Sequence, residues 1–147
     1  MERTLEYLSK KPKMGESVKD LSKINSVIDL IGSTPLIKLN SFPEIDSENE
    51  IFVKAEWFNP GGSIKDRAAL KMILEGINKN ELNSKKTIMD SSSGNTAIAY
   101  AMIGAALGYK VELVTPENIN IERKKTLEAY GAKIIYSSPF EGSDGAI

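Results

Sequence analysis

The most restrictive feature of this sequence is a regular alternation of short apolar segments and helical segments in its second half. The apolar segments begin near Thr87, Lys110 and Lys133, at equal spacing along the chain. The helical segments between them, about 95–107 and 120–130, each end at a glycine, a residue that commonly terminates helices. Strands that alternate with helices of this length are typical of βαβ units. The sequence therefore predicts an α/β fold with a parallel sheet.

The first half carries a less regular pattern. Residues 1–23 are polar and lack sustained apolar periodicity, so we expect an N-terminal arm outside a domain that spans residues 24–147. The helical segment at 95–107 is apolar on nearly every side, and we expect it to be buried. The pattern before it predicts four elements: a short helix over 24–31, a strand over 36–39, a strand over 51–55 and a helix over about 64–78.

The absence of histidine and cysteine limits the chemistry that the chain can perform. Ser-His-Asp and Cys-His triads cannot form, the common zinc sites are excluded, and we expect no metal site. Lys and Arg total 19 and Asp and Glu total 20, for a net charge of −1, which argues against partners bound through bulk charge, such as nucleic acids or membrane surfaces. A magnesium or calcium site built from carboxylates alone stays possible, but the sequence has no Asp-x-Asp-x-Asx-Gly calcium loop. The sequence shows neither a secretory signal nor a membrane-spanning run, so we expect a cytoplasmic protein.

Lys65 is the candidate nucleophile and base, because the turn in Asn59–Arg67 delivers it to the first turn of a predicted helix. The positive end of a helix dipole favours a neutral amine, the form that makes a Schiff base with an aldehyde. Paired glycines in the turn would let a flat ligand approach the backbone closely. The same residues also fit an ordinary helix start, in which Ser63 is the N-cap and Asp66 completes a capping box.

A second candidate loop, Asp90–Thr96, lies between a predicted strand and the apolar helix. Ligands of open α/β sheets bind at the carboxyl ends of strands, and a helix N-terminus is an anion site. Three hydroxyls, a glycine and an amide at this place suit a carboxylate or a phosphate, although Ser and Asn are also the usual residues that cap a helix. Neither a Gly-x-Gly-x-x-Gly fingerprint nor a P-loop is present, so the sequence supports no nucleotide site of those kinds.

Together, and in this order, the two loops resemble those of the cysteine synthase and cystathionine β-synthase family of pyridoxal-phosphate enzymes. The resemblance covers about residues 24–147. It implies the type II fold, similar to the tryptophan synthase β-subunit, in which a three-layer parallel sheet carries helices on both faces. The matching stretches are Ile31–Leu36, Asn59–Arg67, Ser92–Thr96 and, as in bacterial cysteine synthases, Pro139–Ala146.

The resemblance also implies the roles of individual residues. Lys65 would hold pyridoxal phosphate as a Schiff base and remove the α-proton of the substrate. Asn95 would donate a hydrogen bond to the phenolic oxygen of the cofactor. The implied reaction is β-replacement on O-acetyl- or O-phospho-L-serine, in which sulfide adds to give L-cysteine, and the implied assembly is a homodimer. The substrate carboxylate would be held by Ser92, Ser93, Gly94 and Thr96.

Two departures from the family pattern leave alternatives open. Asp90-Ser91-Ser92 stands where many cysteine synthases have Glu-Pro-Thr, so cystathionine β-synthase, threonine dehydratase or threonine synthase chemistry also fits. The phosphate-binding loop of the family comes from a C-terminal half that has no counterpart in this sequence. We therefore expect a truncated chain, the N-terminal portion of a catalytic domain, that binds the cofactor weakly. A non-catalytic remnant that serves as a binding partner is the second interpretation, and an α/β domain without cofactor is the third.

Overall fold

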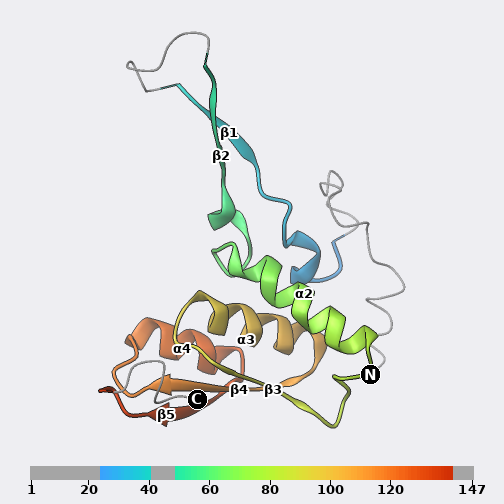
Figure 1. Ribbon diagram of the computed structural model, residues 1–147, viewed down its shortest axis with the longest axis vertical. Coiled ribbons are helices and arrows are strands. Elements are labelled where there is room, and N and C mark those ends of the chain that lie inside the picture. The colour runs from blue at the N-terminus through green and yellow to red at the C-terminus, as the bar shows by residue number, and fades with distance from the viewer. Residues whose placement is uncertain (1–23, 41–48, 141–147) are drawn as a thin grey trace.

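The computed structural model describes residues 24–40 and 49–140, and this part of the chain forms two separate sheets and the helices beside them (Figure 1). The predicted arm at 1–23 and the segment 141–147 lie outside the described residues. In chain order the elements are η2 (Val27–Leu30), β1 (Leu36–Leu39), β2 (Ile51–Lys54), η3 (Glu56–Phe58), α2 (Lys65–Asn78), β3 (Thr87–Ser91), α3 (Asn95–Leu107), β4 (Lys110–Pro116), α4 (Ile121–Ala129) and β5 (Lys133–Ser137).

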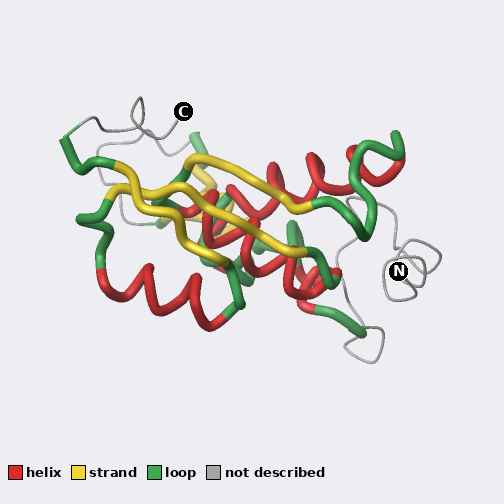
Figure 2. Tube along the Cα trace, turned by 90° about the horizontal axis from the view of Figure 1, so that it is seen from below, coloured by secondary structure: helices red, strands yellow, loops and turns green. Residues whose placement is uncertain are grey.

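The larger sheet confirms the predicted α/β fold. Its strands β3, β4 and β5 are parallel and adjacent in chain order, with Thr87 opposite Lys110 and Glu112 opposite Lys133. Right-handed crossovers between strands in this order place the connecting helices on one face, and Figure 1 shows α3 and α4 on the same side of the sheet. Figure 2 shows the strands from the side that these helices leave open. Within the described residues, helices therefore cover one face of the β3–β4–β5 sheet, and no helix covers the opposite face.

The helix α3 is the centre of the described core, as its apolar sequence predicts. It packs against α2 on one side and against β3 and β4 on the other. Small residues allow this close approach: a Cβ added at Gly104 would overlap a methyl group of Val111 on β4. A helix that touches a second helix and a sheet keeps little surface for water, which explains why its composition lacks an amphipathic pattern. Its buried residues are Ala97, Ala99, Ala101, Met102, Ile103, Gly104 and Leu107.

The predicted ends of the elements agree closely with the structure, with one exception. The helix α3 ends at Gly108, which adopts the left-handed conformation (φ +78°) that glycine accommodates without steric cost. The exception is the helix predicted over 24–31, which is only a single 3-10 turn, η2. Ser26 caps this turn, the side chain of Asp29 accepts a hydrogen bond from the Ser26 backbone N–H, and Gly32 at positive φ follows soon after. The apolar residues there therefore never complete an α-helical repeat.

The strands β1 and β2 pair with each other in antiparallel register, Leu36 opposite Lys54 and Leu39 opposite Ile51. They form a hairpin that projects away from the parallel sheet (Figure 1). Several of its apolar side chains are exposed, including Leu36 at 62% and Phe52 at 47%. The base of this hairpin is tied to the start of α2, and this connection shapes the candidate site.

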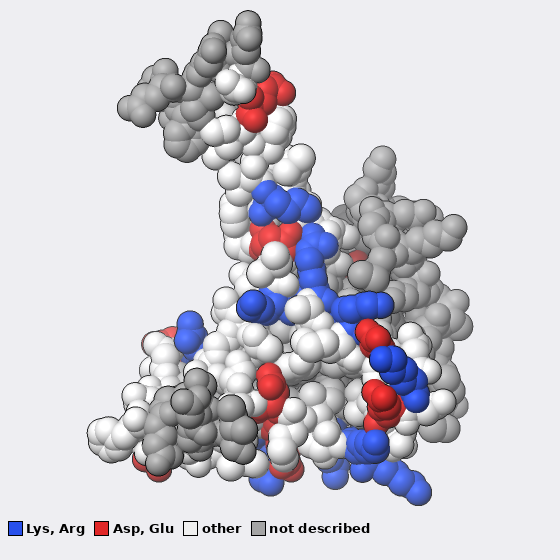
Figure 3. Space-filling model, viewed as in Figure 1, with Lys and Arg blue, Asp and Glu red and all other residues white. Residues whose placement is uncertain are grey.

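Acidic and basic side chains are mixed over the face shown in Figure 3, and they alternate along α2. One of the contacts behind this pattern is the exposed pair of Glu75 and Lys79, one helical turn apart, at 2.9 Å. Among the helices of the described residues, none has the length and apolar character needed to cross a bilayer.

Candidate active site

Lys65 is the first residue of α2, as the sequence predicts. The chain enters this helix through a tight turn in which the Gly62 N–H donates to the Asn59 carbonyl at 2.7 Å, with Gly62 at φ +77°. The Lys65 side chain is exposed, and within the described residues its Nζ has no hydrogen-bond or ion-pair partner. The turn thus presents an exposed side-chain nitrogen without a partner among the described residues.

The capping-box interpretation of this turn is wrong. Ile64 occupies the N-cap position, and no side chain makes a capping hydrogen bond there. The Ser63 hydroxyl accepts from the Lys65 N–H at 3.2 Å. The carboxylate of Asp66 reaches back beyond the N-cap and accepts the Gly61 N–H through Oδ2 at 2.5 Å. Asp66 therefore closes the glycine turn onto the helix instead of completing a box with Ser63.

Asp66 is an unusual carboxyl group for a helix start because its side chain is fully buried. Burial raises the pKa of Asp66, the Gly61 N–H lowers it, and the negative charge of Glu56 raises it further. Its second oxygen, Oδ1, has no hydrogen-bond partner in the described part of the chain. A Cβ at Gly61 would overlap this carboxyl group, so the position admits only glycine while Asp66 keeps its place.

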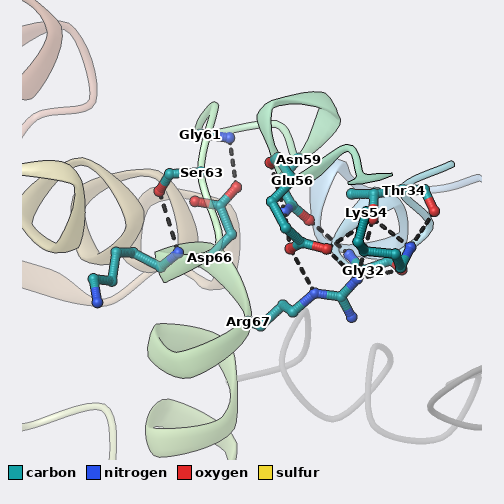
Figure 4. A network of polar contacts seen from close by, with 10 residues as sticks. Gly32, Thr34, Lys54, Glu56, Asn59, Gly61, Ser63, Asp66 and Arg67 are labelled. Atoms are coloured by element: carbon teal, nitrogen blue, oxygen red, sulfur yellow. Dashed lines mark hydrogen bonds and ion pairs between the residues drawn. The ribbon is translucent and has the colours of Figure 1, made fainter. Parts of the chain in front are cut away.

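Arg67 joins the start of α2 to the segments before it (Figure 4). Its guanidinium binds the Glu56 carboxylate in a two-point contact, Nε to Oε2 at 2.8 Å and Nη2 to Oε1 at 2.9 Å. Nη2 also donates to the Gly32 carbonyl at 2.9 Å and to the Thr34 hydroxyl at 3.2 Å. The hydrogen bonds from Arg67 lower the pKa of Glu56 to about 2, with further lowering from Asn59 and Thr34 and an opposing effect of burial.

Asn59 completes this network from within the turn. It is almost fully buried, its Oδ1 accepts the Gly32 N–H at 2.8 Å, and its Nδ2 donates to the Glu56 carbonyl and to Oε2, each at 2.9 Å. The ammonium of Lys54 contacts the carbonyl and the hydroxyl of Thr34. Sequence reasoning treated the stretches around Gly32 and Asn59 as separate motifs, whereas the structure makes them one hydrogen-bonded unit.

The sequence contains residue types that could have predicted part of this network. Glu56 and Arg67 are opposite charges that flank the same turn, and Asn59 is the type of residue that satisfies backbone groups in turns. The contacts cross up to 35 positions of the chain, as between Arg67 and Gly32. Spacing alone cannot reveal such contacts, because they depend on how the hairpin folds back against α2.

The second candidate loop follows β3 and leads into α3. The Ser92 N–H donates to the Val114 carbonyl at 3.1 Å, which extends the pairing of β3 with β4. Gly94 is the N-cap of α3, and no side chain caps it. The capping interpretation of the serines and of Asn95 is therefore wrong. The backbone N–H groups in the first turn of α3 keep their capacity to bind an anion, since the first four lack partners within a helix.

The two predicted loops lie at corresponding positions of neighbouring helices. The helices α2 and α3 pack against each other, and Figure 1 shows both beginning at the same end of the pair. That end also receives the carboxyl end of β3, where ligands bind in open α/β sheets. The exposed residues there include Lys65 and Asn95, while Ser92, Ser93, Gly94 and Thr96 are half-buried. No group of three or more acidic, histidine or cysteine residues within 24–40 and 49–140 is arranged to hold a metal ion.

The α/β fold thus places an exposed lysine at one helix start beside the uncapped start of a second helix, and comparison with known proteins identifies the family. Residues 27–146 match the family described as "Pyridoxal-phosphate dependent enzyme". The chain belongs to this family, as its resemblance predicts.

Several of the similar relatives are cysteine synthases. Cysteine synthase from Aquifex aeolicus is 48% identical over 124 residues, which are 83% of this chain and 38% of that protein. Cysteine synthase B from Salmonella typhimurium is 43% identical over 123 residues, which are 84% of this chain and 40% of that protein. The chain thus spans about 40% of the length of the curated relatives it matches.

Solved structures agree with this assignment of the fold. The cysteine synthase of Entamoeba histolytica superposes with a TM-score of 0.81 at 32% identity, over 92% of this chain and 40% of that chain. An O-acetylserine dependent cystathionine β-synthase of Helicobacter pylori superposes with a TM-score of 0.76 at 37% identity, over 84% of this chain and 40% of that chain. The type II fold is therefore confirmed, and with it the pyridoxal-phosphate dependence of the family.

Proposed function

We propose that this chain forms the lysine-bearing part of a pyridoxal-phosphate enzyme that performs β-replacement on an O-activated L-serine. The observation that carries the proposal is the free amine of Lys65, presented at the start of α2 beside the uncapped start of α3. Cysteine synthases among the relatives favour sulfide as the nucleophile and L-cysteine as the product. The whole activity, like the homodimer and the cytoplasmic location that we propose with it, belongs to the complete protein.

The residues present fit this cofactor on chemical grounds. A Schiff base forms between the cofactor aldehyde and an amine that no other group occupies. Lys65 Nζ has no hydrogen-bond or ion-pair partner within the described residues. Gly62 has open space where a Cβ would stand, so a flat ring can approach the backbone there. When bound, pyridoxal phosphate supplies an electron sink for charge developed at the α-carbon.

Each of the other roles in the proposed reaction belongs to a residue of the chain. Lys65 Nζ anchors the cofactor and afterwards takes the α-proton of the substrate. Asn95 orients the cofactor through its phenolic oxygen. The substrate carboxylate binds at the start of α3, where backbone N–H groups and the helix dipole favour an anion. The residues that hold this carboxylate are Ser92, Ser93, Gly94 and Thr96.

A second candidate function is cystathionine β-synthase chemistry, in which a thiol amino acid replaces sulfide as the nucleophile. The structural similarity to an O-acetylserine dependent cystathionine β-synthase favours it. Asp90-Ser91-Ser92 also departs from the Glu-Pro-Thr of many cysteine synthases. Both candidates use the same lysine and the same carboxylate site, so one experiment tests what they share.

That experiment is reductive trapping. The chain is incubated with pyridoxal phosphate and reduced with borohydride, and peptide mass spectrometry gives the labelled fraction of each lysine. We expect label at Lys65 in clear excess over Lys110, an exposed lysine on β4. Lys65→Arg should remove this excess, whereas Lys71→Arg on the same helix should preserve it. Label spread evenly over the lysines would refute the assignment of Lys65.

The substrate class can be tested on the same material. O-Acetyl-L-serine carries an amine that can displace the cofactor from Lys65, so it should lower the trapped fraction when added before reduction. A carboxylate site fixed beside Lys65 places the amine correctly for only one enantiomer. The D-enantiomer should therefore lower the trapped fraction less at equal concentration. Equal effects of the two enantiomers would show that the amine acts without a specific carboxylate site.

A further inference from the structure

We propose that Arg67 and Asp66 are positioning residues for Lys65, and that they hold the lysine turn against the base of the β1–β2 hairpin. This inference rests on the proposed role of Lys65 as the cofactor anchor. It concerns residues that touch neither cofactor nor substrate in that proposal. The contacts of both residues flank Lys65 on the chain (Figure 4).

Arg67 makes the stronger of the two connections. Its guanidinium contacts both oxygens of Glu56, the Gly32 carbonyl and the Thr34 hydroxyl. A planar fork of donors can satisfy several acceptors at once, which an ammonium cannot do with the same geometry. Gly32 has φ +87°, and a Cβ there would come within 2.8 Å of Arg67 Nη1. The turn at Gly32 is thus shaped to admit this guanidinium.

Asp66 makes the second connection, which runs back to Gly61 in the turn before Lys65 (Figure 4). Its buried carboxyl group holds the Gly61 N–H, and Gly61 leaves no room for a side chain between them. The glycine turn before Lys65 is therefore tied to the residue directly after it. Both connections leave the backbone on either side of Lys65 little freedom to shift.

Lys65 itself contributes little to its own placement. Its backbone N–H donates to the Ser63 hydroxyl at 3.2 Å, in an exposed position. The next N–H groups make the longer bonds typical of a first turn, Asp66 N–H to the Ser63 carbonyl at 3.4 Å and Arg67 N–H to the Ile64 carbonyl at 3.2 Å. Helix starts lack the internal hydrogen bonds of later turns, so the side chains of Asp66 and Arg67 supply the restraint.

A purely structural role would predict a different result from a positioning role. Global unfolding would also remove the preference for Lys65, because that preference requires the folded site. Loss of positioning would lower the labelling of Lys65 in a chain that stays folded, since a displacement of about 1 Å at a reacting group can cost about 100-fold in rate. The labelling of Lys65 relative to Lys110 therefore separates the two roles when it is measured at a temperature at which the variant is folded.

The test compares variants of the network with a matched control on the same helix. Arg67→Met removes the guanidinium, Arg67→Lys keeps the charge without the fork, and Glu56→Gln removes the charge of the partner. Glu75→Gln is the control, because it breaks an exposed ion pair on α2 that has no contact with the turn. Thermal melting of each variant identifies a temperature at which all of them remain folded.

We expect the ratio of the labelled fractions of Lys65 and Lys110 to fall by about tenfold in Arg67→Met. This is the size of effect expected when one set of charge-assisted hydrogen bonds is lost. Arg67→Lys should restore only part of the ratio, since it cannot reach all of the acceptors. Glu75→Gln should leave it unchanged. An unchanged ratio in Arg67→Met would overturn the inference while Lys65 remained the anchor. Absence of Lys65 preference in the unmodified chain would instead overturn the proposed function and this inference with it.

Discussion

Replacement of Gly104 by alanine tests the packing of α3 against the sheet. Gly104 is buried, and an added Cβ would overlap a Val111 methyl group on β4, with Ile88 Cδ1 at 3.8 Å beyond it. Alanine is favoured over glycine within a helix by about 1 kcal/mol. Overpacking a rigid core costs about 1–3 kcal/mol, and Val111 cannot rotate freely because it is β-branched. We therefore expect Gly104→Ala to lower the free energy of unfolding by about 1–2 kcal/mol.

A matched control lies on α2. An added Cβ at Gly76 would be 3.4 Å from Leu82 Cβ, which is an ordinary contact. Gly76→Ala should therefore raise the free energy of unfolding by up to about 1 kcal/mol through helix propensity. Urea denaturation followed by circular dichroism gives both values. In the Val111→Ala background, Gly104→Ala should cost less than in the unmodified chain, since the interfering methyl group is gone.

Equal stabilisation of the chain by Gly104→Ala and Gly76→Ala would contradict the expected overlap with Val111. Such a result would mean that α3 can move away from β4 without loss. The helix would then not be held at the distance that the small side chains permit. An equal cost of Gly104→Ala in the unmodified and the Val111→Ala backgrounds would likewise exclude Val111 as the cause.

Two further predictions concern the network around Arg67. The folded-state pKa of Glu56, about 2, lies below its ordinary value of 4.5, so its ion pair stabilises the chain above pH 4.5 and this stabilisation is lost as the pH falls toward 2. Because the Arg67 side chain is 38% exposed, we expect the ion pair to contribute about 1–2 kcal/mol to the free energy of unfolding. Urea titrations should therefore show that Glu56→Gln is less stable than the unmodified chain at pH 7 and equally stable near pH 2. Gly32→Ala should destabilise by at least about 1 kcal/mol, from positive φ and from contact with the guanidinium; equal unfolding midpoints for this variant and the unmodified chain would contradict that origin.

Local patterns in the sequence were sufficient for most of the fold. The alternation of strands and helices predicts the parallel order of β3, β4 and β5, and the apolar composition of 95–107 predicts a buried α3. The glycine after that helix predicts its end, because few other residues adopt the left-handed conformation seen at Gly108. These features follow from the backbone preferences and the apolar patterning of neighbouring residues, so spacing along the chain reveals them.

The details of the candidate site required long-range contacts. The sequence identifies Lys65 and the loop Asp90–Thr96 as chemically suitable, but local rules also assign Ser63 and Asp66 to an ordinary capping box. The structure shows a buried Asp66 turned toward Gly61 instead. A capping box and this arrangement use the same residue types at the same spacing. Burial by the rest of the fold decides between them.

The sequence by itself determined the order of the elements, the parallel sheet and the residue types that suit pyridoxal-phosphate chemistry. Only the tertiary structure decided that Gly32, Glu56 and Arg67 form one network, and that α2 and α3 begin at the same end of their pair. The physical reason is the range of the interactions. Turn, strand and helix preferences act between near neighbours, whereas a guanidinium and its acceptors meet only after the hairpin and the helix have packed together.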